Sequence, residues 1–388
     1  MTIRFARRTL LAGTAALATA RTMAARPVSA QPASDPVGIL DLVVGARAPT
    51  TPTGLTLSSD GRMFLFMPRF DEKTVFTAGE LFPDGRVAAY PSDAANRPDP
   101  ARPAETLFHV PNGVFDQRNR LWLLDAGLMA SSGESVPGAA KLVCIDPATD
   151  AIVRTISLQP VVTKTSSLND LRVDVRPGRE VAYLTDQGQT GEGALIAVDL
   201  ASGHAVRRLA GHTSTRSVDG ILKIVEGRVL MKRAAEGTTS PIKGGANGIA
   251  LSPDGARLYY TPLMSRRLYA VETAALLDPA KDDAAVADTV TDLGEKGLTG
   301  GLIADSRDRV YLSLQEFNGI GRRDPDGRIE VVATDPRLIW PDTFWITGDG
   351  WLYLSSAQAN RRPEHNGGID RQQQPYAIFR MRIDAGPA

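Results

Sequence analysis

Short apolar runs separated by polar turns recur along the whole chain. Six segments share one form: an apolar run leads into a polar turn, often with Asp-Gly, and then into a second apolar run. The second runs are Met63 to Met67, Leu121 to Leu124, Val181 to Thr185, Leu258 to Thr261, Val310 to Leu314 and Leu352 to Ser355. β-Branched and aromatic residues favour strands, and Asp-Gly turns join strands into hairpins. The pattern therefore predicts six β-hairpins.

A further pair of strands is expected after each hairpin. "KLVCIDPATDAIVRTISL" and "ALIAVDLASGHAVRRLAG" both read as strand, Asp-led turn, strand. Units of four strands over roughly 40–60 residues are typical of propeller blades. No long segment keeps apolar residues at helical spacing. The sequence predicts an all-β fold, a six-bladed β-propeller, in which residues 36–45 supply a strand that closes the ring with the C-terminal "YAIFRMRID".

The first thirty residues have the form of an export signal. A basic start with Arg7 and Arg8 precedes an apolar stretch and small residues, and resembles a twin-arginine signal cleaved after Ala30. A general secretion signal and a membrane anchor are the alternatives. We expect residues 1–30 to be the signal, residues 31–388 to form one propeller domain, and the protein to be periplasmic or secreted.

The charge balance limits the partners. The 388 residues carry 44 basic and 44 acidic side chains, which argues against nucleic acid or a stable association with an anionic membrane. A lone cysteine, Cys144, lies in an apolar run and is expected to be a small buried hydrophobe. The expected state is a monomer whose partner is a small molecule.

The innermost strand of each blade is expected to start at the mouth of the central channel. The starting positions are Thr53, Asn112, Asn169, Asn247, Gly300 and Asp342. Amide and carboxylate oxygens suit Ca²⁺ or another divalent cation, and they also suit a polar ligand. The alternative is structural: Asn-Gly would start a strand because both residues tolerate unusual backbone angles.

Several of these segments resemble the Yellow / major royal jelly protein family. They include "PTGLTLSSDGRMFLFMPRF", "RLWLLDAG", "SLNDLRVD", "NGIALSPDGARLYYTPLMSRRLY" and "RLIWPDTFWITGDGWLYLSSAQ". The resemblance, which suggests a bacterial member, implies a six-bladed propeller. Its insect members include secreted proteins linked to dopachrome conversion and salivary proteins that bind biogenic amines at the channel mouth.

Shorter motifs are similar to the gluconolactonase / regucalcin family of metal-dependent lactonases. "LND" and "NGIALSPDG" would make Asn169 and Asn247 metal-site residues. That family also uses carboxylates where this chain has Thr53 and Gly300. A site held by neutral amides alone would lack the charge that makes such sites tight.

The sequence therefore predicts a small polar or aromatic ligand at the channel mouth. Its contacts would be the mouth residues, beneath two long loops at Lys232–Gly245 and Ala357–Tyr376. For a dopachrome-tautomerase-like isomerase, Asp342 or His109 would move the proton. A metal-dependent hydrolase of lactones and a non-catalytic binding propeller remain the alternatives.

Overall fold

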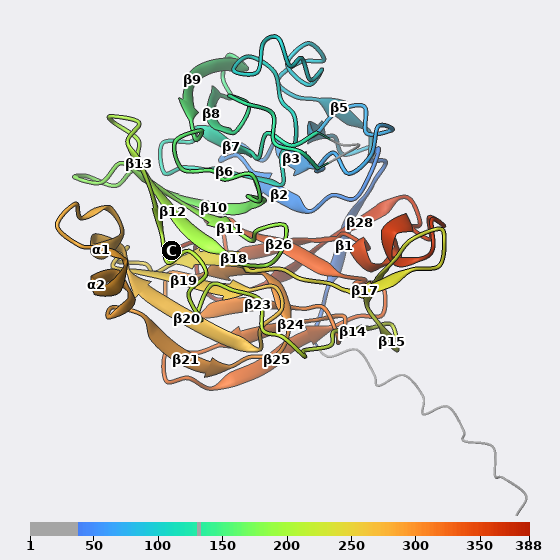
Figure 1. Ribbon diagram of the computed structural model, residues 1–388. Coiled ribbons are helices and arrows are strands. Elements are labelled where there is room, and N and C mark those ends of the chain that lie inside the picture. Colours follow the sequence, from blue (N-terminus) through green and yellow to red (C-terminus); the bar gives the residue numbers. More distant parts are fainter. Residues whose placement is uncertain (1–37, 130–132) are drawn as a thin grey trace, which may run out of the picture. The chain divides into compact units, whose positions relative to one another are not determined.

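Six four-stranded antiparallel sheets make up the computed structural model, which describes residues 38–129 and 133–388 (Figure 1). Residues 1–30, with Arg7 and Arg8, lie outside the described part, so the export signal and its boundary stay predictions. The sheets form a six-bladed β-propeller within one compact unit, Pro36–Ala388. The predicted fold class is confirmed.

Each blade is numbered from its innermost strand outward. The first blade holds β2 (Gly54–Leu57), β3 (Met63–Phe66), β4 (Ala78–Leu81) and β5 (Val87–Ala89). The second holds β6 (Asn112–Phe115), β7 (Leu121–Asp125), β8 (Lys141–Asp146) and β9 (Ala151–Ser157). The third holds β10 (Leu168–Asp174), β11 (Val181–Asp186), β12 (Ala194–Asp199) and β13 (Ala205–Arg208).

The other three blades follow an insertion. The fourth blade holds β18 (Ala246–Leu251), β19 (Arg257–Pro262), β20 (Arg267–Glu272) and β21 (Thr291–Glu295). The fifth holds β22 (Thr299–Ala304), β23 (Val310–Leu314), β24 (Gly319–Arg323) and β25 (Ile329–Thr334). The sixth holds β26 (Pro341–Ile346), β27 (Trp351–Ser356) and β28 (Tyr376–Arg382), with β1 (Asp41–Ala46) as its outer strand.

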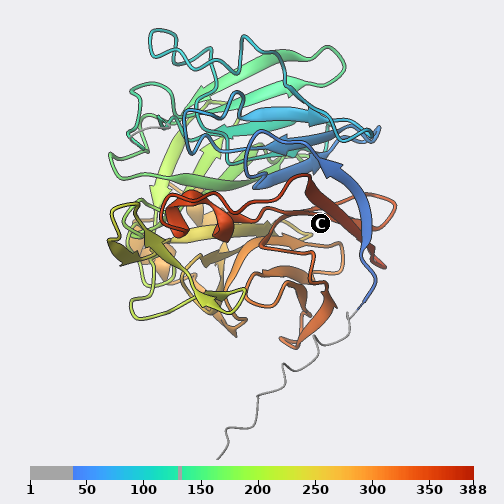
Figure 2. The ribbon, with the colours of Figure 1, turned by 90° about the vertical axis from the view of Figure 1, so that its right-hand side faces the viewer.

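The ring closes through the two ends of the propeller. Strand β1 pairs antiparallel with β28, with Ala46 opposite Tyr376 and Asp41 opposite Arg380. Because the sixth blade combines strands from both ends of the domain, the start of the propeller chain is fastened to the last blade (Figure 2). The predicted closing strand is confirmed.

Apolar side chains fill the spaces between neighbouring blades. Between the second and third blades, Trp122 and Leu124 share a buried cluster with Leu171 and Leu184. The innermost strands contact one another in the order β2, β6, β10, β18, β22, β26 and back to β2. Their starting residues are thereby collected at one end of the channel. Buried Cys144 belongs to the same cluster, as expected, and burial raises its pKa to about 11.

Four inner strands carry an extra residue near their start. The pairing register shifts between Leu168 and Leu171 in β10, and between Ala246 and Gly248 in β18. It also shifts near the start of β22, after Thr299, and of β26, after Pro341. Such β-bulges redirect side chains and are common beside functional sites.

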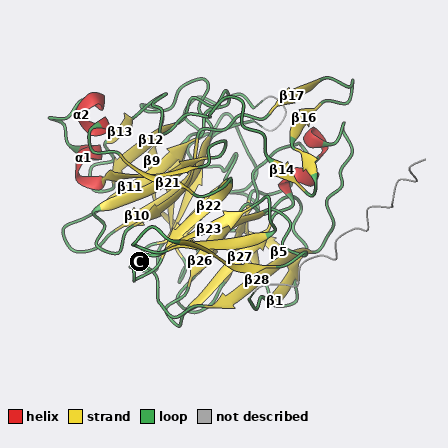
Figure 3. Cartoon of the chain, turned by 90° about the horizontal axis from the view of Figure 1, so that it is seen from below, coloured by secondary structure: helices red, strands yellow, loops and turns green. Residues whose placement is uncertain are grey.

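The long connections have more structure than their polar composition predicts. Between the third and fourth blades lie two hairpins, β14 (Ile224–Val225) with β15 (Arg228–Val229), and β16 (Met231–Arg233) with β17 (Thr239–Pro241). The loop of the last blade holds the 3₁₀ turns η1 (Ala359–Arg361) and η2 (Pro363–His365). These two insertions lie side by side (Figures 1 and 3).

Two short helices complete the fold. Helices α1 (Thr273–Leu277) and α2 (Asp283–Ala287) connect β20 to β21. Asp282 caps α2 by accepting from the Ala285 amide, and Val286 is buried beneath it. Within residues 38–129 and 133–388, no helix is both long enough and apolar enough to cross a membrane.

Candidate functional site

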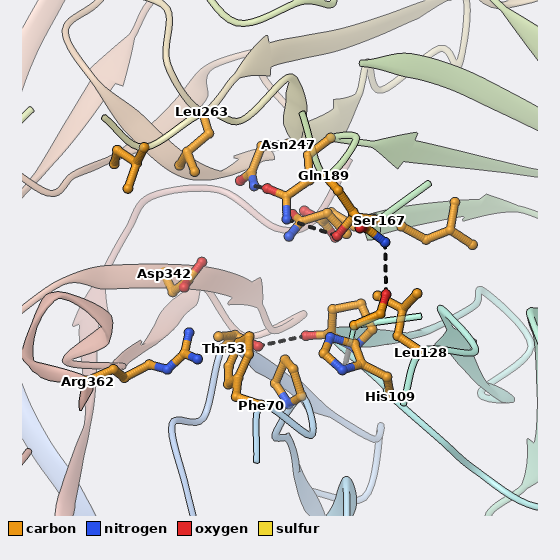
Figure 4. Close-up of a pocket in the computed structure, with 18 of the residues that line it drawn as sticks. Thr53, Phe70, His109, Leu128, Ser167, Gln189, Asn247, Leu263, Asp342 and Arg362 are labelled. Atoms are coloured by element: carbon orange, nitrogen blue, oxygen red, sulfur yellow. Dashed lines mark hydrogen bonds between the residues drawn. The ribbon is translucent and has the colours of Figure 1, made fainter. Parts of the chain in front are cut away.

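A cavity of about 540 Å³ opens at the end of the channel where the inner strands start (Figure 4). Five of the six predicted starting positions line it: Thr53, Asn112, Asn169, Asn247 and Asp342. His109 lines it as well. Gly300 does not line the cavity, although its neighbour Gly301 does. The structure thus brings together the predicted site residues, while their functional roles stay predictions.

The glycines of the inner strands allow a close approach of backbones. A Cβ on Gly248 would lie 2.0 Å from the carbonyl oxygen of Gly300, and one on Gly301 would lie 2.1 Å from that of Asp342. Neither Gly248 nor Gly301 has a positive φ. The structural alternative for Asn-Gly, tolerance of unusual backbone angles, does not apply at Asn247-Gly248, where the glycine makes room for the next blade.

Asp170 reaches the cavity through the bulge of β10. Its Oδ1 accepts hydrogen bonds from Asn112 Nδ2 at 2.5 Å and from the Leu171 amide at 2.7 Å. Arg172 forms an ion pair with the same oxygen at 3.0 Å. Burial raises the pKa of Asp170 above its ordinary value, and these partners oppose that rise. Asn112 is therefore committed to holding Asp170, a residue that the sequence reasoning did not single out.

The side-chain amides of Asn247 and Asn169 keep hydrogen-bonding capacity at the cavity. Asn247 Nδ2 donates to Gln187 Oε1 at 3.1 Å, and Gln187 Nε2 donates to Ser167 Oγ at 3.3 Å. This chain fixes which end of Asn247 faces Gln187 and leaves its Oδ1 for another donor. The side chain of Asn169 forms no hydrogen bond within the described residues and lies against the cavity.

His109 is held in place by the loop that precedes β6. Its backbone amide donates to Asp125 Oδ1 at 3.0 Å, and its Nδ1 donates to the Arg69 carbonyl at 3.2 Å. Its ring lies edge-on to Phe70, with ring centroids 5.6 Å apart. Burial lowers the pKa of His109 to about 4. The imidazole is therefore neutral at pH 7, and it is a weak base.

Thr53 contributes chiefly to the joint between blades. Its Oγ1 donates to the Pro111 carbonyl at 3.0 Å, and its own carbonyl accepts from Thr343 Oγ1 at 2.6 Å. These bonds connect the sixth, first and second blades at the mouth. Thr53 lines the cavity with a hydroxyl whose proton is already used.

Asp342 faces the cavity from the start of β26 (Figure 4). Burial, reinforced by the negative charge of Asp170, raises its pKa to about 8. A hydrogen bond from Trp340 and the positive charge of Lys223 oppose this rise. Asp342 is therefore mainly protonated at pH 7 and can donate a proton to a bound molecule.

Trp340 introduces β26 with a left-handed backbone, φ = 54°. A positive φ is a real outlier for a bulky residue, and such strain is concentrated at functional sites. The indole ring lies 5.0 Å from Lys223 Nζ and also lines the cavity. Trp340 therefore contacts the buried Lys223 and also lines the cavity.

Lys223 is fully buried behind that wall. Its Nζ donates to Gln315 Oε1 at 2.6 Å, and Gln315 Nε2 donates to the Pro341 carbonyl at 3.4 Å. Burial lowers the pKa of Lys223 to about 7, against the pull of Glu316 and Asp342. Gln315 occupies the space beside Gly300, where a Cβ would lie 2.5 Å from Gln315 Nε2. This packing explains why Gly300 itself is absent from the lining.

The two long connections form the upper wall of the cavity. Leu230, Lys232, Ile242 and Lys243 come from the third-to-fourth connection, and Arg362, Glu364 and His365 come from the last-blade loop. The Arg362 guanidinium carbon lies 3.3 Å from the centroid of the Phe70 ring, and Arg362 pairs with Glu364 at 3.0 Å. Both predicted covering loops therefore contribute to the cavity.

The donor set does not match the calcium site implied by the lactonase resemblance. Asn169 and Asn247 are neutral, and Gln315 fills the space beside Gly300. Across residues 38–129 and 133–388, no group of three or more His, Cys, Asp or Glu side chains is placed to hold a metal ion. Calcium sites are built from several oxygen ligands, with carboxylates supplying the charge.

Comparison with known proteins identifies the family. The family model of the major royal jelly proteins matches residues 113–386. The chain belongs to the major royal jelly protein family. Major royal jelly protein 3 of Apis mellifera is 27% identical over 176 residues, which are 44% of this chain and 29% of that protein. Major royal jelly protein 7 of Apis mellifera is 26% identical over 166 residues, covering 41% and 34%. The chain thus matches only about a third of each relative.

Solved structures share the propeller fold at low identity. A calcium-binding regucalcin from Agrobacterium tumefaciens superposes with a TM-score of 0.53 and 16% identity, over 89% of this chain and 94% of that one. A gluconolactonase from Xanthomonas campestris gives 0.52 and 13%, over 90% and 91%. A luciferin-regenerating enzyme gives 0.54 and 12%, over 91% and 97%. These likenesses establish the fold that this member of the major royal jelly protein family shares with them.

Proposed function

We propose that the channel mouth binds a small polar or aromatic molecule, and that the protein is a tautomerase-like isomerase in which Asp342 moves the proton. The observation that carries this proposal is a carboxyl group facing a cavity of about 540 Å³. Cavities of roughly 300–1,000 Å³ are typical for small ligands. The lining combines apolar side chains, such as Leu128, Leu263 and Trp340, with amides that can orient a polar group.

Asp342 and Asp170 have environments that separate their roles. Arg172 and Asn112 favour the ionised form of Asp170 against the effect of burial, whereas burial raises the pKa of Asp342 to about 8. Two carboxyl groups in such different settings can act as acid and base in one site. In a tautomerisation, Asp342 would give its proton to one atom of the ligand and recover a proton from another, so that the protein ends unchanged.

The direct test measures ligand binding and turnover in Asp342→Asn. Amines and catechols would be screened by calorimetry against the full-length protein, and dopachrome conversion would be followed by absorbance. The proposal expects the variant to bind and to lose turnover, while Asp93→Asn, at an exposed position away from the cavity, behaves as wild type. Unchanged turnover in Asp342→Asn would rule out Asp342. Binding without any product would favour the non-catalytic propeller.

A calcium titration separates this proposal from a metal-dependent hydrolase. We expect no binding of Ca²⁺, Mg²⁺, Mn²⁺ or Zn²⁺ tighter than about 10⁻⁴ M, a range that ordinary protein calcium sites reach. Binding that is tighter and disappears in Asn247→Ala would instead support the lactone hydrolase.

We also propose that the mature protein is a periplasmic or secreted monomer. The support is Arg7-Arg8 before an apolar stretch and the neutral charge balance. Replacing both arginines by lysine should leave the protein inside the cell when expressed in a bacterial host. Gel filtration of the mature form should give the mass of one chain.

A further inference from the structure

A second cavity, of about 360 Å³, lies between the two long insertions. One side comes from β14, β15 and β16, and the other from η1, η2 and the residues that follow them. These segments are neighbours in three views of the molecule (Figures 1, 2 and 3). Among the described residues, only Leu230 and His365 line both this cavity and the channel mouth.

Backbone and side-chain bonds hold the two walls together. His365 Nδ1 donates to the Met231 carbonyl at 3.0 Å, and the Gly367 amide donates to the Arg233 carbonyl at 3.1 Å. Arg361 donates to the Glu226 carboxylate from two nitrogens, at 2.6 and 2.9 Å, and Asn360 donates to the same carboxylate at 2.8 Å. These bonds fix the two walls of the cavity relative to each other.

Its lining is strongly basic. Four arginines line it, namely Arg228, Arg233, Arg361 and Arg371, against a single carboxylate, Glu226. Glu226 is already paired with Arg361. Within the described residues the other three arginines form no ion pair, although Arg233 donates to the Val229 carbonyl at 3.4 Å. In a chain with 44 basic and 44 acidic residues, this excess of positive charge is local.

We propose that this arginine-lined pocket, independently of the channel mouth, binds a soluble small molecule through a multiply charged oxyanion group, a phosphate ester or a polycarboxylate. Guanidinium groups offer paired N–H donors that match the oxygens of phosphate and carboxylate. With four guanidinium groups and one carboxylate around the cavity, positive charge is in excess, and a bound anion offsets that excess. The volume leaves room for more than the anionic group itself.

The test titrates full-length protein with pyrophosphate and, separately, with citrate by calorimetry at low and high salt. We expect saturable one-to-one binding of at least one probe, weakened by salt because counter-ions screen the charges. Pyrophosphate alone would identify a phosphate ester as the ligand class, and citrate alone a polycarboxylate. No saturable binding of either probe would overturn the proposal.

Variants assign the binding to this pocket. Arg228→Gln with Arg371→Gln removes two exposed side chains, so the fold should be kept, with thermal unfolding as the check. Loss of two charge-assisted contacts should weaken binding by about tenfold or more. Arg97→Gln, an exposed arginine on another loop, is the matched control. Equal affinity in the double variant and the control would place the anion elsewhere and refute the pocket.

The outcome is separable from the proposed function. Asp342→Asn should bind the anionic probe as wild type does, because Asp342 does not line this pocket. Loss of turnover at the channel mouth would say nothing against anion binding, and loss of anion binding would leave the channel-mouth proposal in place.

Discussion

Two buried lysines, each near an aspartate, show how differently this propeller treats buried charge. Lys141 in the second blade donates to Asp125 at 2.7 Å and to the carbonyls of Pro103, Thr106 and Ala139 at 2.8 to 3.0 Å. Lys223 behind the channel mouth has, among the residues that the structure describes, one hydrogen-bond acceptor, Gln315, and the indole ring of Trp340. Both side chains are fully buried.

The two aspartates differ in the same way. Asp125 accepts from the amides of Phe108, His109 and Gly127 in addition to Lys141. Asp342 has a partner in Trp340, and burial raises its pKa to about 8. A buried charge with complete partners organises structure, whereas one with incomplete partners has a shifted pKa and can change its protonation near neutral pH.

The largest expected effect comes from breaking the ion pair between Lys141 and Asp125. Lys141→Met leaves Asp125 as a buried charge without its cation, so the free energy of unfolding should fall by about 3–5 kcal/mol. Urea unfolding monitored by tryptophan fluorescence measures it. The matched variant Lys223→Met, which removes a lysine with few partners, should cost far less. Equal losses would show that the two lysines do not differ.

The second effect is a loss of activity when Asp342, the aspartate with few hydrogen-bond partners, is replaced. Asp342→Asn should lower turnover by about 100-fold or more, the usual contribution of a general acid. Its stability near pH 4, where the carboxyl is protonated in the folded protein and still partly so when unfolded, should stay within about 1 kcal/mol of wild type, because an amide then replaces a neutral carboxyl of similar shape. Turnover and urea unfolding on the same preparation check both. A large loss of stability would make Asp342 a structural residue like Asp125.

A third effect is the pH dependence of stability. Folded Asp342 keeps its proton up to a pKa of about 8, while an unfolded aspartate releases it near 3.8. Stability contributed by Asp342 is therefore present at low pH and is lost as pH rises toward 8. Relative to Asp342→Asn, wild type should lose up to about 1.4 kcal/mol per pH unit across this window.

Comparison with the variant is needed because His109 has the opposite sign. Its pKa is about 4 in the folded protein against an ordinary value of 6.5, so unfolding takes up a proton between these limits and stability rises with pH there. Both proteins share this contribution, which cancels in the difference. A flat difference between pH 4 and 8 would mean that Asp342 titrates normally.

The smallest expected effect comes from the electrostatic coupling between Lys223 and Asp342. The positive charge of Lys223 lowers the pKa of Asp342. Lys223→Met should therefore move the pH midpoint of turnover upward, while the variant keeps more turnover than Asp342→Asn. A pH–rate profile measures the midpoint. Lys141→Met, assayed where it remains folded, should leave the midpoint unchanged, and a downward shift in Lys223→Met would contradict the coupling.

Sequence reasoning recovered the blades because each unit repeats the same short signals. Alternating β-rich runs and Asp-Gly turns are local, and the structure places the second strands within one or two residues of their predicted bounds. Five of the six mouth positions were also found, since every inner strand starts at the same end of the channel, while Gly300 does not line the cavity. Asn247 and Asp342 were identified by position alone.

The rest of the site depends on contacts that no local pattern encodes. Asp170 follows Asn169 and would face away from the mouth in a regular strand, but the bulge of β10 brings both to the cavity. Gln315 and Lys223 meet although 92 residues separate them. The one available signal was the pair "ND" in "LND", where two adjacent polar residues interrupt the alternation of a strand.

The bulges at the mouth separate what the protein binds from how it folds. Asn247, for example, has no directly paired residue in β19, whereas Ala246 and Gly248 on either side do. A change of side chain there alters the cavity without disturbing the strand ladder. The same scaffold can therefore acquire a new ligand through single substitutions, and an engineer seeking altered specificity should begin with these extra residues.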